Sequence, residues 1–218
     1  PKMKEYIFGV RNNIHIFDLR ITLEALERAL SKLSETMKNS GKVLFVGTKK
    51  QCSEVVKELA LINDNFYVNK RWLGGTLTNF STIKRSINRL KVLEKESSDV
   101  YKNLTKKELT QLNRERNRLS DLHRGIRDMR YLPAALFIVD ANNEKIAILE
   151  AKRLGIPVFA LVDSNTSPLD VDYAIPGNDD SIKSISAILN HISSLLLDLN
   201  SEKEEIKNKQ DDVPKESK

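Results

Sequence analysis

Three runs of apolar residues limit the possible folds of this chain most strongly. They occupy residues 42–47, 134–140 and 157–163, and each is apolar at successive positions rather than at alternate ones. A strand has this composition when both faces of its sheet are covered. The segments between the runs place apolar residues at helical spacing. Strands that alternate with helices predict an α/β fold, with a parallel sheet and helices on both faces.

Shorter patterns complete a predicted sheet of about five strands. Residues 14–19, 66–68 and 173–175 are rich in β-branched and aromatic side chains, which is typical of short strands. Helices are predicted after Thr22, after Lys50, over residues 144–154 and from Asp179 or Asp180 onward. The last stretch, residues 201–218, contains Glu, Lys, Asp and Gln with almost nothing apolar, so we expect a disordered charged tail.

Positive charge is concentrated in residues 70–130, which we call the basic insertion. It contains sixteen Lys and Arg residues against seven Asp and Glu, a net charge of +9, whereas the whole chain carries only +6. The insertion would interrupt an α/β body formed by residues 1–69 and 131–200. A mildly acidic body with one strongly basic insertion indicates a polyanionic partner that contacts the insertion.

Two helices are predicted within the basic insertion. Apolar residues recur at intervals of three or four over residues 77–93 and again over residues 109–126, and Thr105 with Glu108 forms a capping-box pattern. Joined by the polar linker 97–103, the helices should pair as an antiparallel hairpin, a short coiled coil, that projects from the body. Its excess of cations favours a phosphate-contacting surface over an ordinary solvated one.

The start of the basic insertion holds the only tryptophan of the chain. Residues 70–75 are Lys-Arg-Trp-Leu-Gly-Gly. A core position at the junction is the favoured interpretation for Trp72, and a platform for stacking an RNA base is the alternative. Arg71 is the better candidate for contact with a phosphate.

Other classes of site are excluded or disfavoured. The single Cys52 cannot form a disulfide or a shared thiolate zinc site within the chain. No run approaches the roughly 18 apolar residues of a membrane span. The turn at residues 47–50 lacks the G-x-G-x-x-G and G-K-[ST] patterns, so an ordinary turn is favoured over a nucleotide site. His15, His123 and His191 fall on separate elements and are interpreted as structural.

Several motifs, in order along the chain, carry a family resemblance. They are Pro-Lys-Met at residues 1–3, Leu-Phe-Val-Gly-Thr-Lys at 44–49, Arg-Trp-Leu-Gly-Gly at 71–75, Gly-Ile-Pro-Val at 155–158 and Ile-Pro-Gly-Asn-Asp-Asp-Ser at 175–181. Together they cover roughly residues 1–200. The chain resembles the S-two family of small-subunit ribosomal proteins, in its bacterial and organellar form.

The resemblance implies a flavodoxin-like (Rossmann-like) sheet with an inserted helical hairpin, and a structural, non-catalytic role in the small ribosomal subunit. The implied partners are small-subunit rRNA and other small-subunit proteins, including the large S-one protein, in a bacterial cytoplasmic ribosome or an organellar one. No cofactor is required, and neither DNA nor a membrane is an expected partner. Candidate RNA contacts are Arg11, Lys49, Lys50, Arg71, Trp72, Lys84, Arg85, Arg89, Lys91, Arg114, Arg118 and Arg127.

Three carboxylates form a second candidate site. A parallel sheet would bring Asp163, at the end of a predicted strand, near Asp179 and Asp180 at the start of the last helix. Helix capping by Asp179 or Asp180 is the favoured interpretation, and a bound cation is the alternative. The resemblance implies a metal, zinc or magnesium, completed by a histidine from a segment that family members carry ahead of Pro1.

The chain departs from the family pattern in two places. That preceding segment is absent, so we expect the N-terminus to be incomplete. Arg130 and Tyr131 stand where bacterial members tend to have Gly-Gly, which predicts a stiffer exit from the hairpin.

The alternative functions are a nucleotide-binding α/β enzyme using residues 47–50 and a scaffold that docks an acidic partner. No visible pairing of a nucleophile with a base supports the enzyme.

Overall fold

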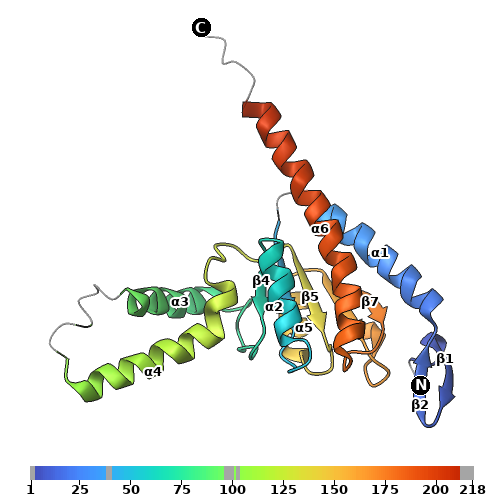
Figure 1. Cartoon of the computed structure of the whole chain (residues 1–218), viewed down its shortest axis with the longest axis horizontal. Helices are drawn as coiled ribbons and strands as arrows, with labels where there is room; N and C mark the ends of the chain where they lie inside the picture. Colours follow the sequence, from blue (N-terminus) through green and yellow to red (C-terminus); the bar gives the residue numbers. More distant parts are fainter. Residues whose placement is uncertain (1–2, 38–40, 96–100, 102–103, 212–218) are drawn as a thin grey trace, which may run out of the picture.

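The chain folds around a parallel sheet of five strands (Figure 1). The computed structural model describes residues 3–37, 41–95, 101 and 104–211. The strands of the sheet are β3 (Val43–Val46), β4 (Phe66–Val68), β5 (Ala135–Val139), β6 (Val158–Val162) and β7 (Tyr173–Pro176). Their spatial order is β4-β3-β5-β6-β7, and every pairing is parallel. This is the flavodoxin-like doubly wound order, which confirms the predicted α/β fold class.

Alternate strand residues supply two separate hydrophobic cores. On one face Phe45, Phe137 and Phe159 pack with α1 (Leu19–Met37), α2 (Ser53–Ile62) and α6 (Ile182–Asp211). On the other face the neighbouring residues Leu44 and Ile138 pack with α5 (Lys145–Arg153) and with part of the basic insertion. The strands are therefore buried on both sides, as their uninterrupted apolar sequences require.

The basic insertion contains α3 (Phe80–Glu94) and α4 (Lys106–His123), followed by the short 3-10 helix η3 (Arg124–Ile126). The two helices lie side by side, run in opposite directions and extend away from the sheet (Figure 1). Four apolar side chains of α3 are buried, Ile83, Ile87, Leu90 and Leu93, whereas those of α4 are half-buried or exposed, because α3 packs against the body as well as against α4. Of the predicted linker, only Tyr101 lies within the described residues.

The prediction for residues 14–19 was wrong about the sheet to which they belong. These residues contribute β2 (Ile14–Phe17), which pairs antiparallel with β1 (Ile7–Arg11) in a separate two-stranded hairpin. Asn12 and Asn13 form the turn with φ values of 51° and 62°. Asparagine tolerates this left-handed conformation, so the Asn-Asn pair was the hairpin signal that the prediction missed.

The predicted disordered tail also needs correction. Helix α6 continues to Asp211, well beyond the expected end near residue 200. Residues 201–211 are mostly Glu, Lys and Gln, which have high helix propensity, and they extend a helix whose nucleation cost has already been met. Residues 212–218 lie outside the described part of the chain. Within that part, no helix is long and apolar enough to cross a membrane.

The outer edge of β4 is covered by the end of the basic insertion. Gly125 in η3 approaches β4 so closely that a Cβ atom at this position would lie 2.1 Å from the carbonyl oxygen of Tyr67 and 2.6 Å from its ring. Only glycine permits this contact. The approach closes an edge strand that would otherwise expose unpaired backbone groups.

Substitution of Gly125 should therefore separate η3 from β4. We expect Gly125→Ala to lower the free energy of unfolding by at least about 2 kcal/mol, because backbone atoms cannot yield as a side chain would. Urea denaturation measures this loss. Gly74→Ala is the matched control, because a Cβ at Gly74 meets nothing within 4 Å. Equal stability of the two variants would contradict the close packing.

Candidate nucleic-acid interface

A single buried carboxylate fixes the start of the basic insertion to the body. Glu150, in α5, is only 7% exposed. Its Oε1 accepts hydrogen bonds from Trp72 Nε1 at 3.1 Å and from the Gly75 amide at 2.7 Å. Its Oε2 accepts from the amides of Leu77 and Thr78 at 2.9 and 3.0 Å, and from the Thr78 hydroxyl at 3.0 Å. Five donors thus converge on one side chain.

The electrostatics of Glu150 follow from these donors. Burial raises the pKa of this carboxyl, but the hydrogen bonds from Thr78, Gly75, Trp72 and Leu77 outweigh that effect and leave its pKa below the ordinary value. Sequence reasoning missed Glu150 because an acidic residue in an amphipathic helix usually faces water. Its spacing from the buried Ala147 and Ala151 was the available signal, since all three lie on one face of α5.

Trp72 occupies the core position that the sequence favoured. The residue is 8% exposed and shares a hydrophobic cluster with Leu44, Ile138 and other strand residues. Because its Nε1 is bonded to Glu150 and its ring is covered, it cannot serve as a base-stacking platform in this arrangement, and we remove it from the candidate RNA contacts. The neighbouring Arg71 is exposed and makes no ion pair with any described residue.

The candidate cations that follow Arg71 in the basic insertion fall into two groups. Arg89 pairs with Glu115 at 2.9 and 3.1 Å, Lys91 with Asp128 at 3.3 Å and Arg127 with Glu94 at 2.9 Å. The other group is exposed and forms no ion pair within the described residues: Lys84, Arg85, Arg114 and Arg118. The Nζ atom of Lys84 instead lies over the Phe80 ring, 4.8 Å from its centre. The second group is better able to contact phosphates.

The three candidates of the body lie in different places. Arg11 is exposed at the end of β1, in the hairpin on the side of the sheet opposite the basic insertion (Figure 1). Lys50 is exposed in the turn after β3. Lys49, one residue before it, points into the protein. The structure therefore does not gather all the predicted cations into one patch.

Lys49 is the internal counter-ion of several carboxylates. Its Nζ lies 2.9 Å from Asp140 Oδ2, from Asp179 Oδ1 and from Asp180 Oδ1. Burial lowers the pKa of Lys49, but these hydrogen bonds outweigh it and raise the pKa above the ordinary value. Because its ammonium group is committed to three anions, we do not retain Lys49 as an RNA contact.

The acidic cluster, Asp163, Asp179 and Asp180, forms as expected. One carboxylate oxygen from each lies within 4.8 Å of the others. Burial raises the pKa of Asp179 to about 6, and the nearby Asp140 and Asp163 act in the same direction against Lys49. Asp179 Oδ2 is buried without a hydrogen-bond partner. The Lys49 ammonium group contacts three carboxylates, and the carboxylate of Asp163 adds a fourth to the cluster, so the site has excess negative charge.

Helix capping does not account for the acidic cluster. The acceptor in this loop is Asn178, whose Oδ1 receives hydrogen bonds from the amides of Asp180 and Ser181 at 2.8 and 3.1 Å. Among the described residues, no amide of α6 donates to Asp179 or Asp180. The favoured capping interpretation of these two aspartates was therefore wrong.

The turn after β3 is arranged for internal contacts rather than for a nucleotide. The Thr48 hydroxyl donates to Glu144, and Asn143 Nδ2 donates to Thr48 Oγ1 at 2.8 Å. Glu144 is buried, and this burial raises its pKa. A phosphate placed at this turn would meet Glu144 and Asp140. The geometry disfavours the nucleotide-binding alternative.

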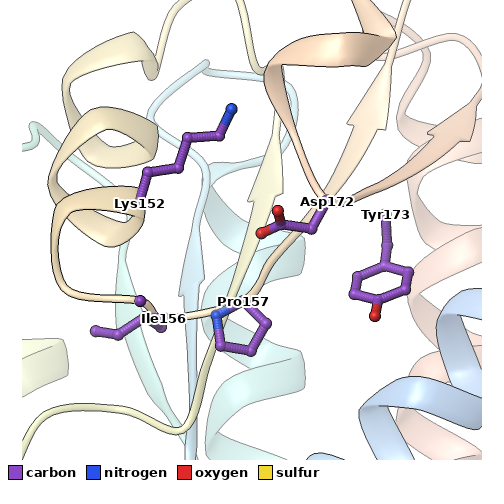
Figure 2. Close-up of a pocket in the computed structure, with 6 residues that line it drawn as sticks. Lys152, Ile156, Pro157, Asp172 and Tyr173 are labelled. Carbon is purple, nitrogen blue, oxygen red and sulfur yellow. The ribbon is translucent and has the colours of Figure 1, made fainter.

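The histidines and one surface hollow offer no reactive arrangement among the described residues. His123 is buried, its Nε2 lies 2.8 Å from Ser86 Oγ, and burial lowers its pKa. A hollow of about 350 Å³ near the start of β6 is lined by Lys152, Pro157 and Asp172, among others (Figure 2). The Asp172 carboxylate accepts from the Val158 amide at 2.8 Å, so it joins β6 to β7. His123 and Asp172 thus have structural partners.

The contacts of Glu150 generate a testable prediction. Glu150→Gln replaces one acceptor oxygen with an amide that faces donors, so we expect the free energy of unfolding to fall by about 2–3 kcal/mol. Urea denaturation at neutral pH measures the change. Glu58→Gln, at an exposed position of α2, is the control and should change stability little.

The stability of Glu150→Gln should depend less on pH in the acid range than the stability of the wild type does. Because the pKa of Glu150 lies below its ordinary value of 4.5, its stabilising effect is present above that pH and is lost as the pH falls below it. The stability difference between the wild type and Glu150→Gln should therefore narrow below about pH 4.5. A difference that stays constant from pH 7 to acid would contradict the proposed role of the ionised carboxylate.

Comparisons with known proteins agree with this arrangement. The family model for ribosomal protein S2 matches residues 1–198. The small ribosomal subunit protein uS2 of Vibrio cholerae is 53% identical over 191 residues, which cover 87% of this chain and 79% of that protein. The uS2 protein of Buchnera aphidicola is 51% identical over 206 residues, or 94% of this chain and 86% of that protein. The chain therefore belongs to the ribosomal protein S2 family.

Proposed function

We propose that this chain is a structural, non-catalytic constituent of the small ribosomal subunit and contacts small-subunit rRNA through its basic insertion. Family membership carries the first part of this proposal. The net charge of +9 on residues 70–130, with several exposed cations that lack internal partners, supports the second part.

The proposed RNA surface has a primary and a secondary set of residues. The primary set is exposed and makes no ion pair with described residues: Arg11, Lys50, Arg71, Lys84, Arg85, Arg114 and Arg118. The secondary set is partly neutralised by neighbouring carboxylates: Arg89, Lys91 and Arg127. Contacts of such residues with phosphates fix position and orientation without reading a base sequence.

The remaining partners follow from the same assignment. We propose that the chain lies beside other small-subunit proteins and helps to dock the S-one protein. The relatives described above are bacterial, which supports the cytoplasmic ribosome of a bacterium over an organellar one. A scaffold for an acidic protein remains the competing function for the basic insertion, because the same cations would attract either partner.

A salt titration separates these two functions. In a variant with Lys84, Arg85, Arg114 and Arg118 changed to Gln, we expect weaker binding to small-subunit rRNA. The slope of log affinity against log salt should flatten by about 0.7–0.9 for each phosphate that the variant no longer neutralises. Filter binding or fluorescence anisotropy measures both quantities.

The matched control removes the same charge from elsewhere on the surface. Arg28, Lys145, Arg153 and Lys183 are exposed residues outside the basic insertion. Changing these four residues to Gln should alter the slope much less. Equal slopes for the two variants would show that the insertion does not contact RNA, and would leave the acidic-partner function as the better account.

We also propose that the acidic cluster binds a divalent cation, zinc or magnesium. Carboxylate oxygens suit magnesium, and zinc accepts them as well. The uncompensated charge around Lys49 and the unpartnered oxygen of Asp179 support a further cation at this place. The fold does not depend on it, because Lys49 already joins Asp140, Asp179 and Asp180.

Direct titration tests the metal proposal. Isothermal titration with zinc and with magnesium should give saturable binding of one of the ions to the chain, and Asp163→Asn with Asp179→Asn should abolish that binding. Asp121→Asn, at an exposed position of α4, is the control for removal of a carboxylate. Saturable binding that survives the double substitution would place the metal elsewhere, and no binding of either ion would refute the site.

A further inference from the structure

The segment between η3 and β5 presents an aromatic ring to solvent. Tyr131 is 82% exposed, the highest value among the exposed large apolar and aromatic side chains of the described residues. Its backbone is held on both sides. Met129 is buried and its amide donates to Ile126 O at 3.1 Å, while the Ala134 amide donates to Lys42 O at 2.9 Å. The ring therefore stands on a short, anchored segment.

A cavity of about 370 Å³ lies beside this ring. It is lined by Lys42, Phe66, Asp128, Arg130, Tyr131 and Leu132, among others. Its volume falls at the lower end of the range for small-ligand pockets. The cavity has an apolar wall from Phe66 and Leu132 and a basic rim from Lys42 and Arg130. Lys42 Nζ lies 5.3 Å from the centre of the Phe66 ring.

The basic rim is only partly neutralised. Lys42 pairs with Asp64 at 2.7 Å, and Asp128 pairs with Lys91 at 3.3 Å. Arg130 is exposed and makes no ion pair with any described residue. The lining of the cavity thus keeps a cation that is available to a ligand, next to an exposed ring.

A second, smaller cavity connects this place with the helices of the basic insertion. It has a volume of about 190 Å³ and shares Asp128 and Arg130 with the first cavity. Lys84, Lys91 and Arg127 line its other parts. Cationic side chains therefore continue from the flank of α3 to the ring of Tyr131.

Exposed aromatic rings beside a track of cations are typical of sites for single-stranded nucleic acid. The cations follow the phosphates, and an unpaired base stacks on the ring. A peptide would gain less here, because the exposed ring lies next to an unpaired arginine rather than in a purely apolar groove.

We propose that an unpaired nucleotide of RNA enters this cavity, with its base stacked on Tyr131 and its phosphate bound by Arg130. This inference rests on the proposed function, because the cations of the basic insertion must first hold the RNA strand. It adds a base-binding site to a surface that would otherwise contact only phosphates.

Single-residue variants test the site with a defined probe. The probe is a fluorescent oligouridylate of about ten nucleotides, a length within the usual site size for single-strand binding. We expect Tyr131→Ala to weaken its binding to the full chain by about tenfold, because the variant cannot stack one of the bases. Tyr131→Phe keeps the ring and should bind as the wild type does. The same oligonucleotide annealed to oligoadenylate should bind both variants equally.

Two controls make the outcomes distinguishable. Phe8→Ala removes another exposed ring, in β1, and should not change the affinity. If Tyr131→Ala binds like the wild type while the fourfold Gln variant of Lys84, Arg85, Arg114 and Arg118 binds weakly, the base site is refuted and the proposed RNA surface stands. If neither change matters, both proposals fail. If Tyr131→Ala keeps its RNA affinity but reduces the incorporation of another small-subunit protein during reconstitution, the occupant is a peptide and the base site is refuted.

Discussion

The five hydrogen bonds that Glu150 accepts join α5 to the start of the basic insertion, and the rest of the structure depends on this junction. A parallel sheet needs helices on both faces, and α5 alone does not cover the second face of this one. Trp72 and Leu77 complete that face, and both bond to Glu150 through a side-chain or backbone donor. Since the same carboxylate orients the segment that leads into α3, it links closure of the core to the direction of the basic insertion.

Some cations of this protein have an internal carboxylate partner, and others have none among the described residues. Lys49 is surrounded by carboxylates at the ends of the strands, where it joins three loops. Lys84, Arg85, Arg114 and Arg118 have no such partners among the described residues. Charge alone therefore does not identify a binding residue. The absence of an internal counter-ion separates the cations that stabilise the fold from those available to a polyanion.

The sequence predicted the parts of the structure that depend on local pattern. Uninterrupted apolar runs correctly predicted β3, β5 and β6, and the capping box predicted from Thr105 and Glu108 is present. Residues whose roles depend on distant partners were assigned less well. Lys49 was placed on the RNA surface because only the folded sheet brings Asp140 and Asp179 to it. Glu150 was missed because its donors lie more than seventy residues away.

That separation has a consequence for the order in which the chain folds during its own synthesis. Trp72 precedes Glu150 by 78 residues. At about 5–20 residues per second, a ribosome needs roughly 4 to 16 s to make that interval. Throughout it, the indole ring and the Gly-Gly turn lack their acceptor, whereas α3 and α4, which end at Glu94 and His123, are both synthesised before Glu150. The nascent chain thus contains both helices of the basic insertion before the contact between Trp72 and Glu150 can form. A polyanion that bound the hairpin at this stage would bind it before the α/β body has folded.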